Sequence, residues 1–363
     1  MRNLIHFRTR HLRSLLVYFI SISCLVLGCK SAYRSPLNPT EGGSMDQGSG
    51  GMEGGSVGDG SMGGMDDNTG GMFNIDPPQS TCDAQGPSKL YAVHIMKFAL
   101  VDQGVSSGFN LDGEVSQLAG DTGCGRTDFV DEQGREGIDN QFAELIPILD
   151  PVIGQPLNEA LERTISEKAF IVLLEVQGID NSVEDDCVKV NLFRATPQVL
   201  VGNDGYLLEG QSYAIDPELP WATAPQAWIE GGKVITTGFE LELPLSFSAI
   251  TLNLFLDQSY LELDLNPSLP SDEESTPLPE DPANPLATLP SEIQGILGGS
   301  LPLEPLIETI ADVESSIEGV ARQLLLTKAD LAPNERGLCQ AISIAWTFKA
   351  RQGYFYLDSW YPQ

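Results

Sequence analysis

The chain has 363 residues, with 51 Asp and Glu against 20 Lys and Arg, which gives a formal net charge of −31. Such a surface repels phosphate and excludes nucleic acid as a partner. Two of the three histidines, His6 and His11, lie at the extreme N-terminus, so His94 alone is left for chemistry in the remainder of the chain.

Residues 1–28 have the pattern of a secretory signal peptide, because four arginines and no acid accompany an apolar stretch, Leu15–Leu27, too short to span a membrane. The stretch ends in Leu25-Val26-Leu27-Gly28-Cys29, which resembles the lipobox of bacterial lipoproteins. The resemblance implies that Cys29 becomes a lipidated N-terminus carrying diacylglycerol and palmitate. Lys30 follows in place of Asp, which implies delivery to the outer membrane, on its periplasmic face or at the cell surface. The alternative is a buried helix with a core cysteine.

Residues 29–81 predict a lipidated cysteine followed by a disordered tether. Between Glu41 and Met72, 13 of 32 residues are glycine, and such a composition forms no packed core. Methionines beside acids in this segment admit a copper(I) site, since thioethers are soft ligands. A flexible spacer is the simpler interpretation of the five methionines Met45, Met52, Met62, Met65 and Met72.

Residues 82–363 predict one mainly β domain. Apolar or alternating runs rich in β-branched residues indicate strands at Tyr91–Leu100, Ala169–Gln177, Val188–Phe193, Lys233–Leu243, Ser248–Leu265, Ala341–Phe348 and Tyr354–Leu357. A turn is expected at Asn203-Asp204-Gly205. We expect these strands to form an antiparallel β-sandwich of the jelly-roll kind.

Helices are expected at Ile138–Leu149 and Leu157–Ser166, and one longer amphipathic helix is expected at Pro305–Thr327. Residues 266–291 contain seven prolines and a group of acids. This composition predicts an extended insertion at the surface of the domain.

Cysteine usage indicates an oxidising compartment. An even number of cysteines remains after the lipidation site, which predicts two disulfides among Cys82, Cys124, Cys187 and Cys339. Three connectivities are open. We favour Cys82–Cys124 with Cys187–Cys339, because each of the last two cysteines begins a strand.

The stretch from Gly108 to Asn140 combines acids, amides and glycines, the residue types that supply oxygen ligands on a sharply turning chain. It predicts a calcium site, although its spacing is not that of an EF-hand. The alternative is a glycine-rich loop in which the same side chains cap turns. The candidate ligands are Asp112, Asp121, Asp128, Asp131, Asp139 and Asn140.

A second acidic loop repeats part of the first, since Gly178-Ile179-Asp180-Asn181 echoes Gly137-Ile138-Asp139-Asn140 and is followed by Glu184, Asp185 and Asp186. One interpretation is a turn motif used twice. The other is that the two loops meet at one end of the domain, where their charges would require a cation.

Enzymatic patterns are few. A G-x-S-x-G motif is absent, and His94 within an apolar strand predicts a core histidine rather than a general base. The sequence is compatible with a pair of carboxylates that hydrolyses polysaccharide, because the spacing of acids along the chain does not fix their separation in space. The four tryptophans Trp221, Trp228, Trp346 and Trp360, with nearby tyrosines, suit either a sugar-stacking platform or core packing.

The chain resembles uncharacterised secreted lipoproteins of myxobacteria and related groups. The shared features are the lipobox, the tether, the stretch from Leu111-Asp112-Gly113 to Gln141 and a late cysteine before a strand. That resemblance implies no activity. We expect a non-enzymatic, outer-membrane-anchored lipoprotein that presents an acidic, disulfide-bonded β-sandwich for binding or envelope structure, with calcium in its loops and a polysaccharide or an envelope protein as partner. The alternative is a secreted polysaccharide-active hydrolase using two carboxylates. A third interpretation treats the acidity as adaptation to a saline medium.

Overall fold

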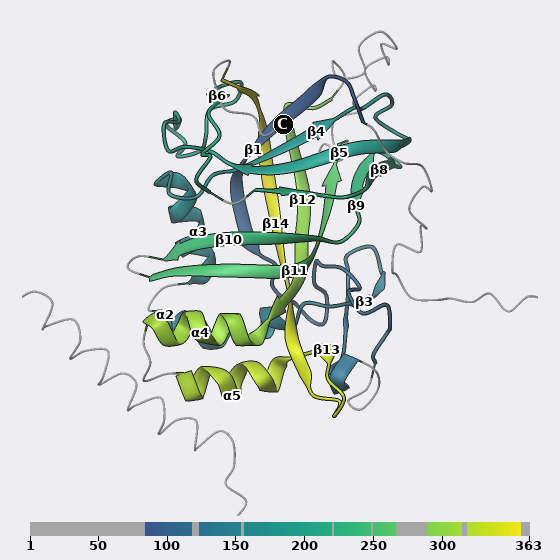
Figure 1. The fold of residues 1–363 in the computed structure, drawn as a ribbon, viewed down its shortest axis with the longest axis vertical. Coiled ribbons are helices and arrows are strands. Elements are labelled where there is room, and N and C mark those ends of the chain that lie inside the picture. Colours follow the sequence, from purple (N-terminus) through teal and green to yellow (C-terminus); the bar gives the residue numbers. More distant parts are fainter. Residues whose placement is uncertain are drawn as a thin grey trace, which may run out of the picture. The chain divides into compact units, whose positions relative to one another are not determined.

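The strands of the domain join almost entirely into one sheet (Figure 1). They are seen in a computed structural model that describes residues 84–117, 123–153, 156–219, 221–247, 250–265, 289–313 and 318–356. The predicted signal peptide, Cys29, the tether and residues 266–288 of the predicted insertion lie outside the described residues.

Twelve strands form the main sheet, and β2 and β3 form a separate antiparallel pair. The strands are β1 (Ser88–Phe98), β2 (Phe129–Val130), β3 (Glu136–Ile138), β4 (Val172–Gln177), β5 (Asp185–Arg194), β6 (Ser212–Tyr213), β7 (Ala222–Thr223), β8 (Ala227–Glu230), β9 (Lys233–Thr236), β10 (Phe239–Phe247), β11 (Ile250–Asp264), β12 (Glu292–Pro302), β13 (Leu331–Pro333) and β14 (Cys339–Phe355).

The main sheet closes on itself. Antiparallel pairings run from β1 through β4, β5, β8, β9, β11, β12 and β14, and β14 pairs again with β1. The pairing between β6 and β14 is parallel and lies off this ring. The mainly β, mostly antiparallel prediction is therefore confirmed, but a sandwich of two facing sheets is not, because the strands belong to one continuous sheet.

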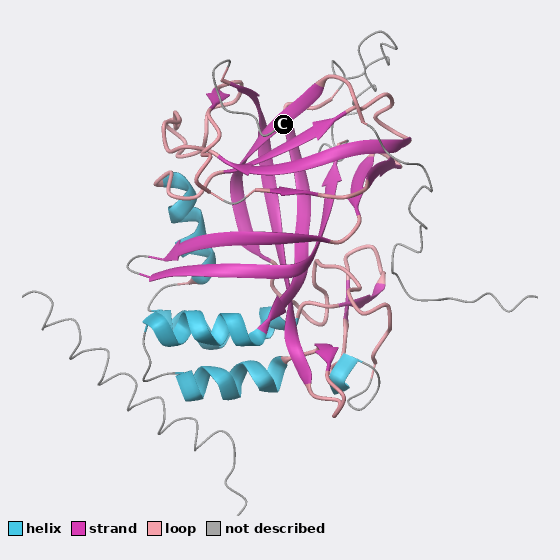
Figure 2. Cartoon of the chain, in the orientation of Figure 1, coloured by secondary structure: helices cyan, strands magenta, loops and turns pink. Residues whose placement is uncertain are grey.

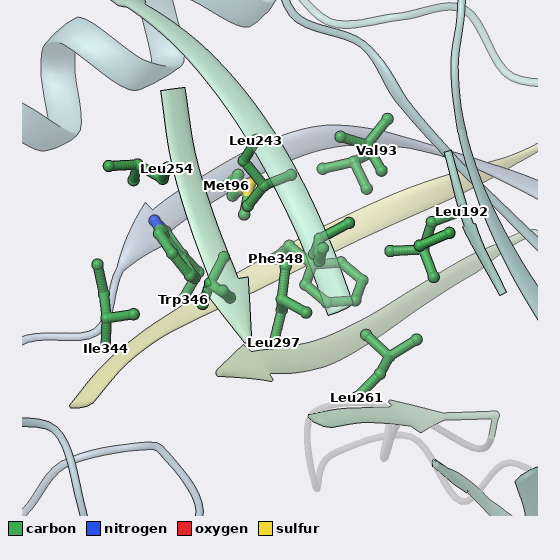
Figure 3. Close-up of a cluster of buried hydrophobic side chains, with 14 of the residues drawn as sticks. Val93, Met96, Leu192, Leu243, Leu254, Leu261, Leu297, Ile344, Trp346 and Phe348 are labelled. Atoms are coloured by element: carbon green, nitrogen blue, oxygen red, sulfur yellow. The ribbon is translucent and has the colours of Figure 1, made fainter. Parts of the chain in front are cut away.

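The inside of the closed sheet is filled by apolar side chains contributed by most of its strands, as Figure 3 shows for Trp346, Phe348, Leu261 and Leu297. The void left between these side chains is about 10 Å³, at the lower limit of the room that one water molecule needs. Around this void the described side chains inside the sheet form a packed core.

The leucines of β11 explain how this strand serves two partners. Leu254 and Leu256 are buried at even positions, whereas Leu261 and Leu263 are buried at odd positions. Pairing with β10 slips by one residue between Phe239 and Leu241, and such a bulge reverses which side chains face the core. Beyond the bulge β11 pairs with β12 and β9.

The helices are the 3-10 helices η1 (Gly123–Gly125) and η2 (Gln141–Glu144), and the α-helices α2 (Ile146–Ile153), α3 (Leu157–Ser166), α4 (Leu303–Val313) and α5 (Glu318–Lys328). Helices α3, α4 and α5 contact strands of the main sheet (Figure 2), and their buried apolar side chains belong to the same cluster as those inside it. None of the helices in the described part is long and apolar enough to cross a membrane.

Several expected elements agree with the structure and others do not. The helix at 157–166 is confirmed, and a β-bridge between Val201 and Leu207 confirms the turn around Asp204. The helix expected at 305–327 is wrong as a single element, because α4 and α5 lie side by side as two helices (Figure 1). The two strands expected near the C-terminus are one strand, β14.

The favoured disulfide pairing is wrong. Cys124 is joined to Cys339, and their Cα atoms are 6.0 Å apart. Cys187 is disulfide-bonded as well, whereas Cys82 lies outside the described residues. Strand position misled the prediction, because the chain folds back so that the loop before β2 meets the start of β14.

Candidate functional site

Four aspartates from distant parts of the chain gather beside this disulfide, and we call them the aspartate cluster. Asp112 lies in the loop after β1, Asp128 directly precedes β2, and Asp139 directly follows β3. Asp330 lies between α5 and β13. The charges of Asp112, Asp128 and Asp330 all act on Asp139, which places the four carboxyl groups in one electrostatic unit.

Backbone N–H groups hold the carboxyl groups in place. The Oδ2 atom of Asp139 accepts hydrogen bonds from the backbone N–H of Leu111 at 2.6 Å and of Asp112 at 3.3 Å. The Oδ2 atom of Asp128 accepts one from the N–H of Ser116 at 2.5 Å. These bonds tie the 108–117 loop to the ends of β2 and β3, so the loop and the cluster form together.

Asp330 is fixed from the opposite side by β14. The N–H of Ser343 donates to Asp330 Oδ1 at 2.8 Å, and the Ser343 hydroxyl donates to Asp330 Oδ2. The same hydroxyl oxygen accepts a hydrogen bond from the N–H of Gln141 at 2.7 Å. Ser343 therefore joins Asp330 to the segment that carries Asp139.

Two residues, Gly137 and Asn110, shape the 108–117 loop. Gly137 has φ +82°, and a Cβ there would lie 2.7 Å from Asn110 Nδ2. Asn110 closes the turn that contains Asp112, because its Oδ1 accepts from the Gly113 N–H at 2.7 Å and its Nδ2 donates to the Glu114 carbonyl at 2.9 Å.

Burial and mutual repulsion raise the pKa values of three aspartates of the cluster. Burial, followed by the charges of Asp330, Asp112 and Asp128, raises the pKa of Asp139 to about 9. Burial also raises the pKa of Asp330 to about 7, despite the hydrogen bonds from Ser343, and that of Asp128 to about 6. At neutral pH the cluster therefore holds either protons or a compensating cation.

The structure brings together only some of the predicted calcium ligands. Asp112, Asp128 and Asp139 belong to the cluster, while Asp121 lies outside the described residues. Asp131 is used elsewhere, because its carboxylate pairs with the Arg135 guanidinium and accepts the N–H groups of Gln133 and Arg135. It shapes the β2–β3 turn instead of facing the cluster.

Asn140 is also a structural residue. Its side-chain amide, buried to 99 %, donates to the Ala99 carbonyl at 3.1 Å and to the Ser106 hydroxyl at 2.9 Å.

Asp330 was missed in the sequence analysis, because a single acid in the sequence Lys328-Ala329-Asp330 carries no motif. Asp330 reaches the other three aspartates only because β14 packs beside them and Ser343 holds its carboxylate.

The two similar loops do not meet. Asn140 contacts Ala99 just beyond the C-terminal end of β1, whereas the Gly178 N–H donates to the carbonyl of Pro87, just before its N-terminal end. Gly137 and Gly178 share φ values of +82° and +80°, so a repeated turn is the interpretation that the structure favours. The Asp185 carboxylate satisfies backbone N–H groups of its own loop.

Within the described ranges, no three His, Cys, Asp or Glu side chains are arranged as a metal ion would require. The aspartates of the cluster are close enough to repel one another, but their oxygens are directed mainly to backbone N–H groups. Metal binding there would therefore require the carboxylates to turn inward.

A sugar-binding cleft receives little support. Trp346 and Trp228 are buried in the domain, which confirms core packing for these two tryptophans. Trp221 is half-exposed, and Trp360 lies outside the described residues. His94 is buried as well, but it contacts Glu292 on the face of the sheet opposite the core.

The sequence matches no protein-family model, and neither a curated protein nor a solved structure shows detectable similarity to it.

Proposed function

We propose that this protein is a lipid-anchored, non-enzymatic binding module of the outer membrane whose aspartate cluster takes up a divalent cation, most suitably calcium. The convergence of Asp112, Asp128, Asp139 and Asp330 on one buried position supports this proposal. Calcium prefers carboxylate oxygens in an adaptable arrangement, which suits ligands carried by a loop.

Two buried aspartates of the cluster lack a cationic partner among the described side chains. Asp139 and Asp330 are both 98 % buried, and neither forms an ion pair with a described Lys or Arg side chain. Burying one unpaired carboxylate costs roughly several kcal/mol of folding free energy. A cation between them would remove this cost, and the folded domain would then be more stable with the cation than without it.

The rest of the domain suits binding better than hydrolysis. The closed sheet has a filled interior, and the cluster is built into a loop that β14 and the disulfide hold in place. On this proposal the cation rigidifies the 108–140 region as a surface for an envelope protein or polysaccharide, and the tether and the lipid at Cys29 position that surface at the membrane.

The test is the thermal stability of the full chain at neutral pH, in calcium and in chelator, at constant ionic strength. Saturation at 100 times the dissociation constant stabilises a protein by about 2.7 kcal/mol, which corresponds to a rise of several degrees in Tm. Magnesium serves as the second cation, to separate site binding from general screening.

Two variants locate the effect. Asp330→Asn removes a charge of the cluster and should abolish the calcium-dependent rise, whereas Asp131→Asn, a predicted ligand outside the cluster, should retain it. Equal melting temperatures of the wild type in calcium and in chelator would refute the proposal. Loss of the rise in Asp131→Asn but not in Asp330→Asn would move the site away from the cluster.

A further inference from the structure

His94 lies at an irregularity on the outer face of the closed sheet. The pairing of β1 with β14 slips between Val93 and Ile95, so His94 is the extra residue of a β-bulge. Its neighbour Val93 faces the core, while the His94 side chain is only 2 % exposed on the other face. Bulges of this kind redirect a side chain.

A carboxylate on β12 is shared between His94 and a cation on β14. The Oε2 atom of Glu292 lies 3.2 Å from His94 Nε2 and 3.2 Å from Arg351 Nε. Lys349 Nζ lies 4.0 Å from the other carboxylate oxygen. The contact of Glu292 with His94 favours a protonated ring, although it does not have the geometry of a hydrogen bond to a neutral one.

A turn covers this histidine. Residues 201–207 form the turn, closed by the bridge between Val201 and Leu207, and the Tyr206 ring meets the His94 ring edge-on at 5.3 Å between centroids. Arg351 holds the turn, because its Nη1 donates to the Leu207 carbonyl at 3.1 Å and lies 3.5 Å from Asp204 Oδ2. The same guanidinium lies 5.7 Å from the Tyr206 ring centroid.

Burial and two neighbouring cations oppose a charged imidazole at His94, whereas the Glu292 carboxylate favours one. The groups facing His94 are Glu292 on β12, Arg351 and Lys349 on β14, and Tyr206 in the turn; Asp204, at the tip of the turn, is exposed. Burial, followed by the charge of Arg351, lowers the pKa of His94 to about 4, although Glu292 opposes this shift.

We propose that His94 and the 201–207 turn form an acid-sensitive latch, in which protonation of His94 opens the turn from the outer face of the sheet. A protonated ring cannot remain buried without water, and it competes with Arg351 for the same Glu292 oxygen. Arg351 is the side chain that holds the turn, so both effects favour opening.

Opening uncovers an apolar surface. Leu207 is 1 % exposed and packs in a cluster on the outer face with Leu90, Ala92, Phe193 and Tyr213. When the turn lifts, Leu207 leaves this cluster, and the apolar side chains that it covers on the outer faces of β1 and β4 become more exposed to solvent. This inference is independent of the aspartate cluster and of any cation.

Hydrogen exchange of the full chain tests the latch. The amides of Gly202, Leu208 and Gly210 are bonded within or beside the turn, and those of residues 344–348 in β14 serve as the internal reference. After correction for intrinsic rates, the opening equilibrium of the turn should rise close to tenfold per pH unit as the pH falls from about 6.5 toward 4. The reference amides should change much less.

The variant His94→Gln should remove this selective response while retaining a polar side chain. A wild-type turn whose protection follows the reference amides across the range would overturn the proposal. If His94→Gln fails to fold, NMR titration of the wild type decides, because the only other histidines are His6 and His11. An ordinary titration of His94 near 6.5 with an unchanged turn would contradict the latch.

Discussion

The side-chain carboxyl groups of Asp128 and Asp139 are in hydrogen-bond contact. Two carboxylates have no proton to share, so without a cation between them this contact requires one of the pair to be protonated. Asp139 is the more deeply buried of the two, and its pKa of about 9 identifies it as the group that holds the proton. The domain therefore stores a proton where a cation would otherwise lie.

The first prediction concerns pH in the absence of divalent cations. Because the folded-state pKa of Asp139, about 9, lies above its ordinary value of 3.8, the folded protein binds more protons than the unfolded chain. This contribution to stability is complete below pH 3.8 and is lost as the pH rises toward about 9. Denaturant unfolding in chelator, comparing wild type with Asp139→Asn, should show a free-energy difference that grows in favour of the variant between these limits.

The size of that difference is also predicted. An asparagine accepts the Leu111 N–H bond and can donate to Asp128 as the protonated acid does. In chelator at neutral pH, Asp139→Asn should stabilise the domain by about 1–3 kcal/mol, because no carboxyl group must be neutralised on folding. Destabilisation in chelator would show that a charged Asp139 is preferred, and the proton assignment would then be wrong.

The disulfide is expected to contribute substantially to stability. It joins residues 215 positions apart, so its loss frees a long segment of the unfolded chain. The double variant Cys124→Ser/Cys339→Ser should lose about 2–5 kcal/mol in denaturant unfolding. Peptide mapping of the non-reduced wild type is the direct check, and a Cys82–Cys124 peptide would contradict the pairing described above.

Glycines in β12 are predicted to be required for strand packing. A Cβ at Gly295 would lie 2.5 Å from the Glu262 carbonyl oxygen and 2.6 Å from Phe348 Cζ. Gly295→Ala should therefore destabilise the domain by about 1–3 kcal/mol through overpacking. Gly319→Ala in α5 is the matched control, because its Cβ would meet nothing within 4 Å and alanine should stabilise the helix by about 0.5–1 kcal/mol.

The lipid anchor is predicted to depend on one cysteine. In a bacterial host, the wild type should incorporate labelled palmitate and sediment with membranes, whereas Cys29→Ser should do neither. Cys24→Ser, which changes the other cysteine of the predicted signal, should behave as the wild type. Membrane association without label incorporation in the wild type would refute lipidation.

Local sequence patterns were sufficient for several elements. The helix at Leu157–Ser166 follows from its apolar spacing, and β1, β4, β5 and β11 follow from apolar or alternating runs. The strand β12 escaped because Gly295, Gly298 and Gly299 interrupt its pattern, and their need for close packing is visible only once β11 and β14 lie beside them.

The candidate site divides in the same way. Asp112, Asp128 and Asp139 were found because acids and glycines concentrate between residues 108 and 140, whereas Asp131 and Asn140 have the same residue types but serve a turn and a buried amide network. Composition identifies the side chains that could supply ligands to a cation. It does not show which of them already form hydrogen bonds with backbone groups.

The sequence alone determined the classes of structure, since the period of apolar residues depends on the local backbone: mainly β, with a secretory pattern and an acidic loop. Only the tertiary structure decided the closure of β1 onto β14, the pairing of Cys124 with Cys339 and the arrival of Asp330 at the cluster. The disulfide and the approach of Asp330 join residues roughly 200 positions apart. The pairing of β1 with β14 joins the two ends of the described domain. Such contacts depend on how whole elements pack, and no local pattern encodes them.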